Sequence, residues 1–249
     1  MLDVEGITKA FAGVHALEDV TLAVEDGEFV SIIGPNGSGK TTLFNCISGF
    51  LRPDRGTVAF DGRPIAGRAP FQIARLGMTR TFQSVRLFGQ LSALENLTVA
   101  LQQHQGDTAV GRFFRSPAVR RHESAAVAKA RELLARVKLE THESTPAAEL
   151  SYGQRKLLSI AAALMASPKL VLLDEPTAAV NPTAILAIRD LLRELHREGQ
   201  AILLVEHNMQ FVMDLSERVV VLDAGQKIAE GSPHEVRADQ RVLEAYLGT

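Results

Sequence analysis

The sequence predicts an α/β fold in which a mostly parallel sheet has helices on both faces. Two apolar runs, residues 170–173 and 201–205, are continuous rather than alternating, which is typical of strands buried on both faces. The segment between them carries one apolar helical face, formed by Ile185, Ile188, Leu191 and Leu195. Buried strands that alternate with helices along a chain form parallel sheets.

The first 60 residues carry mainly strand signals. Three short β-rich runs are separated by polar residues or glycine, at residues 4–7, 20–24 and 29–33. After the third run we expect a helix that continues to about Ser48, because Gly49 follows. Residues 57–60, followed by Asp61-Gly62, predict half of a hairpin.

From about residue 69 to 149 the pattern changes to helix. Four apolar residues recur at three- and four-residue steps, namely Val127, Ala130, Leu134 and Val137. Residues 104–121 are polar and rich in arginine, and we interpret them as a solvated surface loop. From Tyr152 a further helix leads into the strand at 170–173. The 249 residues therefore predict one domain, 1–249, with a helical insertion.

Composition excludes several classes of protein. The formal net charge is −2, so no basic field indicates nucleic-acid binding. Cys46 is the only cysteine, which rules out an intramolecular disulfide, and we expect it to be a small buried apolar group. No apolar run approaches the ~20 residues needed to cross a bilayer, and the acidic start lacks the features of a signal peptide. We expect a cytosolic chain, so any membrane function requires another, spanning subunit.

A glycine-rich loop is the strongest motif. It reads Gly34, Pro35, Asn36, Gly37, Ser38, Gly39, Lys40, Thr41, and matches G-x-x-x-x-G-K-[ST] between a predicted strand and a predicted helix. Its backbone N–H groups and the helix N-terminus suit phosphate oxygens. Lys40 is expected to reach the β- and γ-phosphates of ATP, and the Thr41 hydroxyl to ligate Mg²⁺. The alternative, a glycine-rich turn with a chance lysine, does not account for the flanking strand and helix.

Acidic residues and a histidine follow the buried strands. Asp174 and Glu175 end the run at 170–173, and adjacent residues at a strand end point in different directions. Asp174 can therefore serve a metal ion while Glu175 faces the attacking water. A plain polar end to a buried strand is the alternative, and the loop at 34–41 makes it weaker. His207 follows the strand at 201–205. The other six histidines show no metal-ligand spacing, so no structural metal is predicted.

A third segment gives a family resemblance. Leu150-Ser151-Tyr152-Gly153-Gln154 resembles the signature motif LSGGQ of ATP-binding cassette (ABC) proteins, and it lies between the phosphate loop and the Asp174 strand, as in that family. Ser151 can cap the helix, and Gly153 permits close approach of an anion. The departure is Tyr152, where the general motif has glycine.

The resemblance implies a P-loop NTPase fold of the ABC ATPase type, with a mostly parallel core sheet, an N-terminal antiparallel β subdomain and a helical subdomain. Residues 1–84 and 155–249 would form the catalytic core with the β subdomain, and residues 85–154 the helical subdomain carrying the signature motif. Phe11 would stack on adenine, Gln83 would sense Mg²⁺ and water, and His207 would contact the γ-phosphate.

The implied site residues fall into three groups. The catalytic group is Glu175, His207 and Gln83, and the metal group is Thr41, Gln83 and Asp174. The nucleotide group is Phe11, Gly34, Pro35, Asn36, Gly37, Ser38, Gly39, Lys40, Thr41, Thr42, Ser151, Gly153 and Gln154. The family's D-loop falls at Ala179-Val180-Asn181, with Ala179-Val180 where Gly-Leu is commoner.

A narrower resemblance points to the ATPases of branched-chain amino acid importers. It rests on residues 42–50, 80–88 and 245–248. It implies a head-to-tail ATPase dimer, homo- or heteromeric, in which Ser151 and Gly153 of one copy complete the ATP site of the other. Its further partners would be transmembrane permease subunits and an extracytoplasmic substrate-binding protein. The chain would then lie at the cytoplasmic face of the inner membrane, with the permease docked near Gln83 to Phe88. Phe82, Leu87 and Phe88 are either docking or core residues.

Two alternatives stay open at this stage. One is the ATPase of a lipopolysaccharide exporter, a family that resembles this chain closely. The other is a soluble ABC ATPase acting in DNA repair or on the ribosome. Chains of that second kind usually carry a long coiled coil or two cassettes, whereas this one has a single set of motifs.

Overall fold

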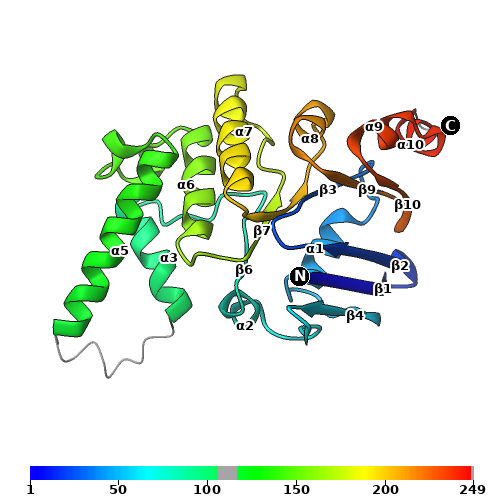
Figure 1. Cartoon of the computed structure of the whole chain (residues 1–249), viewed down its shortest axis with the longest axis horizontal. Helices are drawn as coiled ribbons and strands as arrows, with labels where there is room; N and C mark the ends of the chain where they lie inside the picture. The colour runs from blue at the N-terminus through cyan, green and yellow to red at the C-terminus, as the bar shows by residue number, and fades with distance from the viewer. Residues whose placement is uncertain (106–116, 248–249) are drawn as a thin grey trace.

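The computed structural model, which describes residues 1–105 and 117–247, contains two sheets and a set of helices (Figure 1). The smaller sheet has the strand order β2 (Val14–Val24), β1 (Leu2–Phe11), β4 (Arg55–Phe60), β5 (Arg63–Pro64). The larger sheet has the order β10 (Gln226–Gly231), β9 (Arg218–Asp223), β3 (Phe29–Ile33), β8 (Ala201–Val205), β7 (Leu170–Asp174), β6 (Met78–Arg80).

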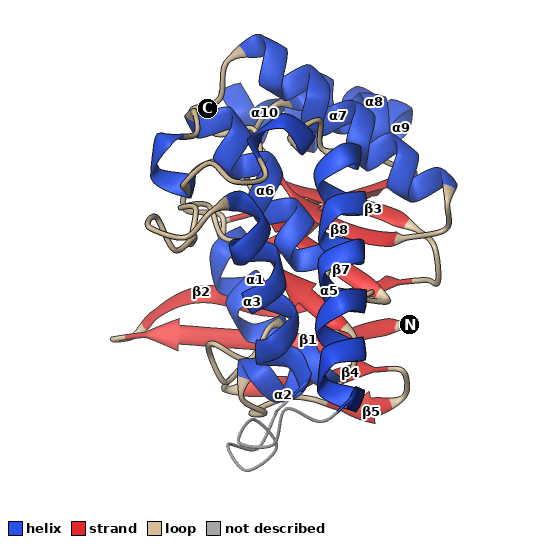
Figure 2. Cartoon of the chain, turned by 90° about the vertical axis from the view of Figure 1, so that its left-hand side faces the viewer, coloured by secondary structure: helices blue, strands red, loops and turns tan. Residues whose placement is uncertain are grey.

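The helices lie mainly around the larger sheet (Figure 2). Their bounds are α1 Lys40–Ile47, α2 Pro70–Arg75, α3 Ala93–Gln105, α5 Pro117–Arg136, α6 Tyr152–Leu164, α7 Pro182–Arg197, α8 Met209–Leu215, α9 Pro233–Ala238 and α10 Gln240–Leu247. Two single 3₁₀ turns, η1 (Glu140–His142) and η2 (Ala147–Glu149), connect α5 to α6. Each described helix around the sheet is too short or too polar to span a bilayer.

The larger sheet confirms the prediction of a mostly parallel core. β6, β7, β8, β3 and β9 are parallel neighbours, and only the edge strand β10 is antiparallel. Both faces are buried, which explains the continuous apolar runs. In β7, Leu170 and Leu172 pack with α1 and the small sheet, whereas Val171 and Leu173 pack with α6 and α7.

The smaller sheet is antiparallel throughout. Its first two strands, β1 and β2, are longer than the apolar runs at 4–7 and 20–24, because their added residues are mostly exposed or only partly buried and do not form an apolar run. The predicted hairpin after residue 60 is confirmed: Asp61 and Gly62 have φ of 49° and 69°, as a tight hairpin turn requires.

The prediction of helix from 69 to 149 is wrong in part. Residues 78–80 form β6, the edge strand beside β7. A strand of three residues is too short to show a period of two, and it is fixed by pairing with residues 92 positions further along the chain. The predicted loop at 104–121 is also wrong at its ends, because α3 reaches Gln105 and α5 starts at Pro117; residues 106–116 lie outside the described part.

Gly56 tests how closely β4 packs against β1 in the small sheet. It has a φ of 87°, and a Cβ there would lie 2.4 Å from the carbonyl oxygens of Glu5 and Gly6. We expect Gly56→Ala to lower the free energy of unfolding by clearly more than the about 1–2 kcal/mol that left-handed backbone costs an alanine. Gly62→Ala is the matched control, since its φ is 69° but the space around it is open. Equal losses in urea denaturation would contradict the packing argument.

Candidate nucleotide-binding and catalytic site

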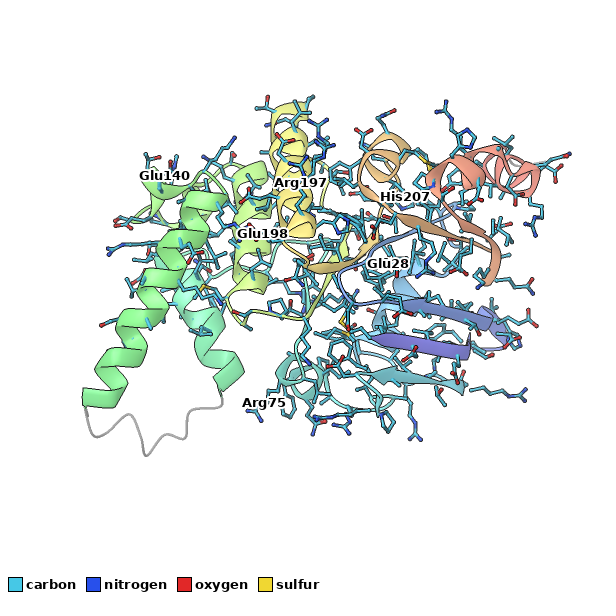
Figure 3. All side chains as sticks on the ribbon, viewed as in Figure 1. Glu28, Arg75, Glu140, Arg197, Glu198 and His207 are labelled. Atoms are coloured by element: carbon cyan, nitrogen blue, oxygen red, sulfur yellow. The ribbon has the colours of Figure 1, made fainter. Side chains whose placement is uncertain are left out.

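The predicted site residues follow the carboxyl ends of four neighbouring strands. The phosphate loop follows β3, His207 follows β8, Glu175 follows β7 and Gln83 follows β6. Carboxyl ends of adjacent parallel strands open onto one edge of a sheet, the usual ligand position in α/β folds. Figure 3 shows His207 on the α8 side of this edge, apart from Glu140 in the helical part.

Two glycines fix the course of the phosphate loop. Gly34 has a φ of 151°, and a Cβ there would lie 2.0 Å from the Leu222 carbonyl oxygen of β9. Gly39 has a φ of 99°, and its Cβ would lie 2.5 Å from the Ala16 carbonyl oxygen of β2. Both clashes are with backbone, which cannot move aside, so the loop is pressed between the two sheets and its conformation requires glycine.

The Lys40 side chain folds back onto the start of the phosphate loop. Its Nζ donates to the carbonyl oxygens of Gly34 and Pro35, each at 2.9 Å, and to Ser38 Oγ at 3.3 Å. Burial lowers the pKa of Lys40, and the Glu175 carboxylate opposes that shift. The helix α1 has Gly39 at its N-cap without a side-chain cap, so its first N–H groups are open to an anion. The loop therefore offers N–H groups and one ammonium to a phosphate chain.

The three predicted catalytic residues meet at Glu175. Gln83 Nε2 donates to Glu175 Oε2 at 2.6 Å, and His207 Nε2 lies 2.9 Å from Glu175 Oε1. Glu175 has a φ of 46°, a left-handed conformation that costs a non-glycine residue about 1–3 kcal/mol. The carboxylate is thus held from both sides in a strained position, which is suited to orienting one water molecule or taking its proton.

Asp174 is paired with a residue that the sequence did not single out. Arg80 donates to Asp174 Oδ2 at 2.7 Å, and both side chains are only 6% exposed. Arg80 also donates to Asn45 Oδ1 and Ser48 Oγ, and its guanidinium lies 5.3–5.6 Å from three phenylalanine rings, those of Phe44, Phe50 and Phe82. Burial lowers the pKa of Arg80, which Asp174 opposes. Because Arg80 ends the unpredicted strand β6, no sequence pattern indicated this pair.

Glu206 is a second residue that the sequence did not single out. It is 2% exposed, and its carboxylate accepts from the backbone N–H groups of Thr177 at 2.8 Å and His207 at 3.0 Å. These bonds tie the turn after β7 to the turn after β8. The sequence carried one signal for Glu206: it is an acidic residue directly after an apolar strand, which is the same pattern that identified Asp174.

The predicted metal ligands carry the kinds of donor atom that a magnesium ion takes. Thr41, Gln83 and Asp174 line one cavity of about 550 Å³ together with Tyr152 and Ala179. They supply hydroxyl, amide and carboxylate oxygens, which suit a hard cation. In the described ranges no group of three His, Cys, Asp or Glu side chains forms a metal site by itself.

The signature segment is built into the start of α6. Ser151 Oγ accepts from Gln154 N at 3.3 Å and Gln154 Oε1 accepts from Ser151 N at 2.9 Å, a reciprocal capping box. A Cβ on Gly153 would lie 2.5 Å from Ala184 Cβ of α7, so close helix packing also requires this glycine. Among the described residues, no hydrogen bond joins Ser151, Gly153 or Gln154 to the loop at 34–41.

The remaining predicted positions lie around this edge. Phe11 is 46% exposed near the tip of the β1–β2 hairpin, and β2 contacts the loop through Ala16 beside Gly39. Thr42 is half-buried in α1. Ala179 has a φ of 58°, which gives a physical reason why glycine is commoner there.

The C-terminal segment that carried the narrower resemblance is residues 245–248, of which Gly248 is outside the described part. Tyr246 of α10 is hydrogen-bonded to the Gly34 backbone, which partly offsets the rise in its pKa caused by burial.

Comparison with known proteins gives a consistent result. A family model described as ABC transporter matches residues 17–178, and one described as branched-chain amino acid ATP-binding cassette transporter matches residues 226–249. The whole chain is 41% identical to the high-affinity branched-chain amino acid transport ATP-binding protein BraF of Pseudomonas aeruginosa, of which it covers 98%.

Solved structures agree. A nucleotide-free ATP-binding cassette from an ABC transporter superposes with a TM-score of 0.86 at 36% identity, over 100% of this chain and 99% of that one. A dimeric cassette in a post-hydrolysis state, bound to ADP and Pi, superposes with a TM-score of 0.79 at 28% identity, over 94% and 99% of the two chains.

The Arg80–Asp174 pair gives a prediction about stability. Arg80→Met leaves the Asp174 carboxylate buried without its partner, so we expect the free energy of unfolding to fall by about 3–5 kcal/mol. Combining it with Asp174→Asn should cost less than the sum of the two single changes, by at least about 0.5 kcal/mol. Arg241→Met, which breaks an exposed pair with Asp239, is the control and should change stability little. Additive losses in urea denaturation would show that the two side chains are not coupled.

Proposed function

This chain belongs to the ABC transporter family, and on that premise we propose that it is the ATP-hydrolysing subunit of an importer for branched-chain or related amino acids. The observation that carries the ATPase proposal is the Gln83–Glu175–His207 network at the strand edge next to the phosphate loop. The 41% identity to BraF and the match of residues 226–249 favour the importer over a lipopolysaccharide exporter or a soluble ABC ATPase.

The proposed mechanism has three parts: phosphate binding, hydrolysis and metal binding. The backbone N–H groups of the loop at 34–41 and the Lys40 ammonium bind the β- and γ-phosphates. On binding, Lys40 Nζ exchanges its bonds to the Gly34 and Pro35 carbonyl oxygens for bonds to phosphate oxygens. Glu175 orients the attacking water and accepts its proton, while Gln83 and His207 hold the carboxylate. Mg²⁺, when bound, would be held by Thr41, Gln83 and Asp174 and would neutralise phosphate charge.

A second ATPase subunit, identical or homologous, completes each site in this proposal. Ser151, Gly153 and Gln154 of one copy would contact the γ-phosphate held by the other, and Phe11 would stack on the adenine. Two facts support this division: the hydrogen bonds of Ser151 stay within the first turns of its own helix, and a related cassette has been solved as a dimer. We also propose that residues 85–154 act as the helical subdomain and residues 1–84 and 155–249 as the core.

The membrane partners would dock in an apolar groove beside the site. The groove has a volume of about 480 Å³ and lies between α2, the segment after β6, and α6. Three phenylalanines along it are strongly exposed for aromatic residues: Phe71 at 57%, Phe88 at 53% and Phe50 at 45%. Phe82 and Leu87 are half-buried and also line it. We propose that a cytoplasmic helix of a permease subunit fills this groove.

We propose the location and the remaining partners on the same basis. The chain would lie at the cytoplasmic face of the inner membrane as a peripheral subunit, and an extracytoplasmic binding protein would deliver the amino acid to the permease. The near-neutral charge gives no reason to add a nucleic acid.

The proposed role of Glu175 is tested by a substitution that keeps its shape. We expect Glu175→Gln to bind ATP with unchanged affinity but to lower kcat about 10²-fold or more, because the amide cannot accept the proton. Calorimetry measures the affinity and phosphate release measures kcat. Glu198→Gln is the control, since Glu198 pairs with Arg136 at the far end of α7 and should turn over normally. Native turnover by Glu175→Gln would contradict the assignment.

The docking proposal is tested by placing charge in the groove. We expect Phe71→Glu/Phe88→Glu to melt at the wild-type temperature and to bind ATP normally, but to lose co-purification with the permease subunits when they are expressed together. Leu243→Glu, at an equally exposed apolar residue on α10, should co-purify. Retention of the permease by the double variant would exclude this groove as the docking site.

A further inference from the structure

The helix that begins with the signature segment buries a lysine one turn further on. Lys156 is 2% exposed and is among the largest fully buried side chains of the described residues. An ammonium is costly to bury unless it is hydrogen-bonded. The sequence predictions assigned it no role, and the site described above does not use it.

Its ammonium joins two segments of the proposed catalytic site. Lys156 Nζ donates to the main-chain carbonyl oxygen of Gln83 at 2.7 Å and to that of Glu175 at 3.0 Å. The side chains of the same two residues are hydrogen-bonded to each other at 2.6 Å. Gln83 and Glu175 are therefore linked twice, once through their side chains and once through Lys156.

The bond to Glu175 acts on strained backbone. Glu175 has a φ of 46°, so its carbonyl direction is one that L residues rarely adopt. Its N–H is bonded to the Val205 carbonyl oxygen, and its carbonyl oxygen accepts from Lys156 and from Ala178 N. Burial lowers the pKa of Lys156, while the nearby carboxylates of Glu206, Asp174 and Glu175 oppose that shift. The Lys156 ammonium is thus paired, and its position is fixed by the segments that follow β6 and β7.

We propose that Lys156 is a positioning residue for hydrolysis, which transmits the position of α6 to the main chain of Gln83 and Glu175. The proposal rests on the function given above for these two residues. In the dimer, the first turn of α6 contacts the ATP of the other subunit, and Lys156 lies in the second turn. A shift of α6 at one site therefore displaces Gln83 and Glu175 at the other.

The test compares three variants of the full chain in the assembled transporter. Lys156→Met keeps the length of the side chain without a donor, and Lys156→Arg keeps a cation that can donate twice. Lys129→Met is the matched control, because it removes one charge from the helical part, where the ammonium contacts Ser167 rather than the site. We measure kcat by phosphate release, ATP affinity by calorimetry and melting temperature.

We expect Lys156→Met to lower kcat at least tenfold with ATP affinity changed less than twofold, and Lys156→Arg to recover most of the activity. Lys129→Met should match the wild type. A Lys156→Met chain that turns over within twofold of wild type overturns the proposal. So does one that loses folding and ATP binding together, because Lys156 is then only structural. Glu175→Gln, assayed in parallel, separates the two hypotheses: if it hydrolyses ATP normally, the proposed function itself fails.

Discussion

The parallel pairing of β3, β8, β7 and β6 is the constraint on which the rest of the structure depends. These strands come from four separate parts of the chain, and their hydrogen-bonded register brings the phosphate loop, His207, Glu175 and Gln83 to one edge. Burial of both sheet faces fixes the register, since a slip of one residue would send every apolar side chain to the opposite face. The geometry of the proposed catalytic site is therefore set by the core.

Buried charges then fix the loops that leave this edge. Arg80 holds Asp174, Glu206 joins the turns at Thr177 and His207, and Lys156 joins Gln83 to Glu175. If any of these buried groups lost its partner, the free energy of unfolding would fall. Together they surround a glutamate in left-handed backbone, and their hydrogen bonds offset the cost of that conformation.

The sequence was sufficient for features that are local. The phosphate loop, the buried strands and the acidic residue pair at 174–175 were recognised because motif and periodicity lie within a few consecutive residues. β6 and Arg80 were not recognised, because a three-residue strand shows no period and its partners in β7 lie 92 residues further along the chain. The burial of Lys156 was not predicted either, since a lysine next to an arginine in a helix suggests an exposed face. Its burial depends on strand ends that sequence spacing does not reveal.

Arg80 belongs to two cavities at once. It lines the groove that carries Phe71 and Phe88, and it also lines the cavity that holds Thr41 and Asp174. Phe50 and Phe82, two of the rings around its guanidinium, line both cavities as well. The partition between the two spaces is thus a single layer of side chains. A helix that moves these rings from one side changes the support of the Asp174 carboxylate on the other, without any movement of the sheet.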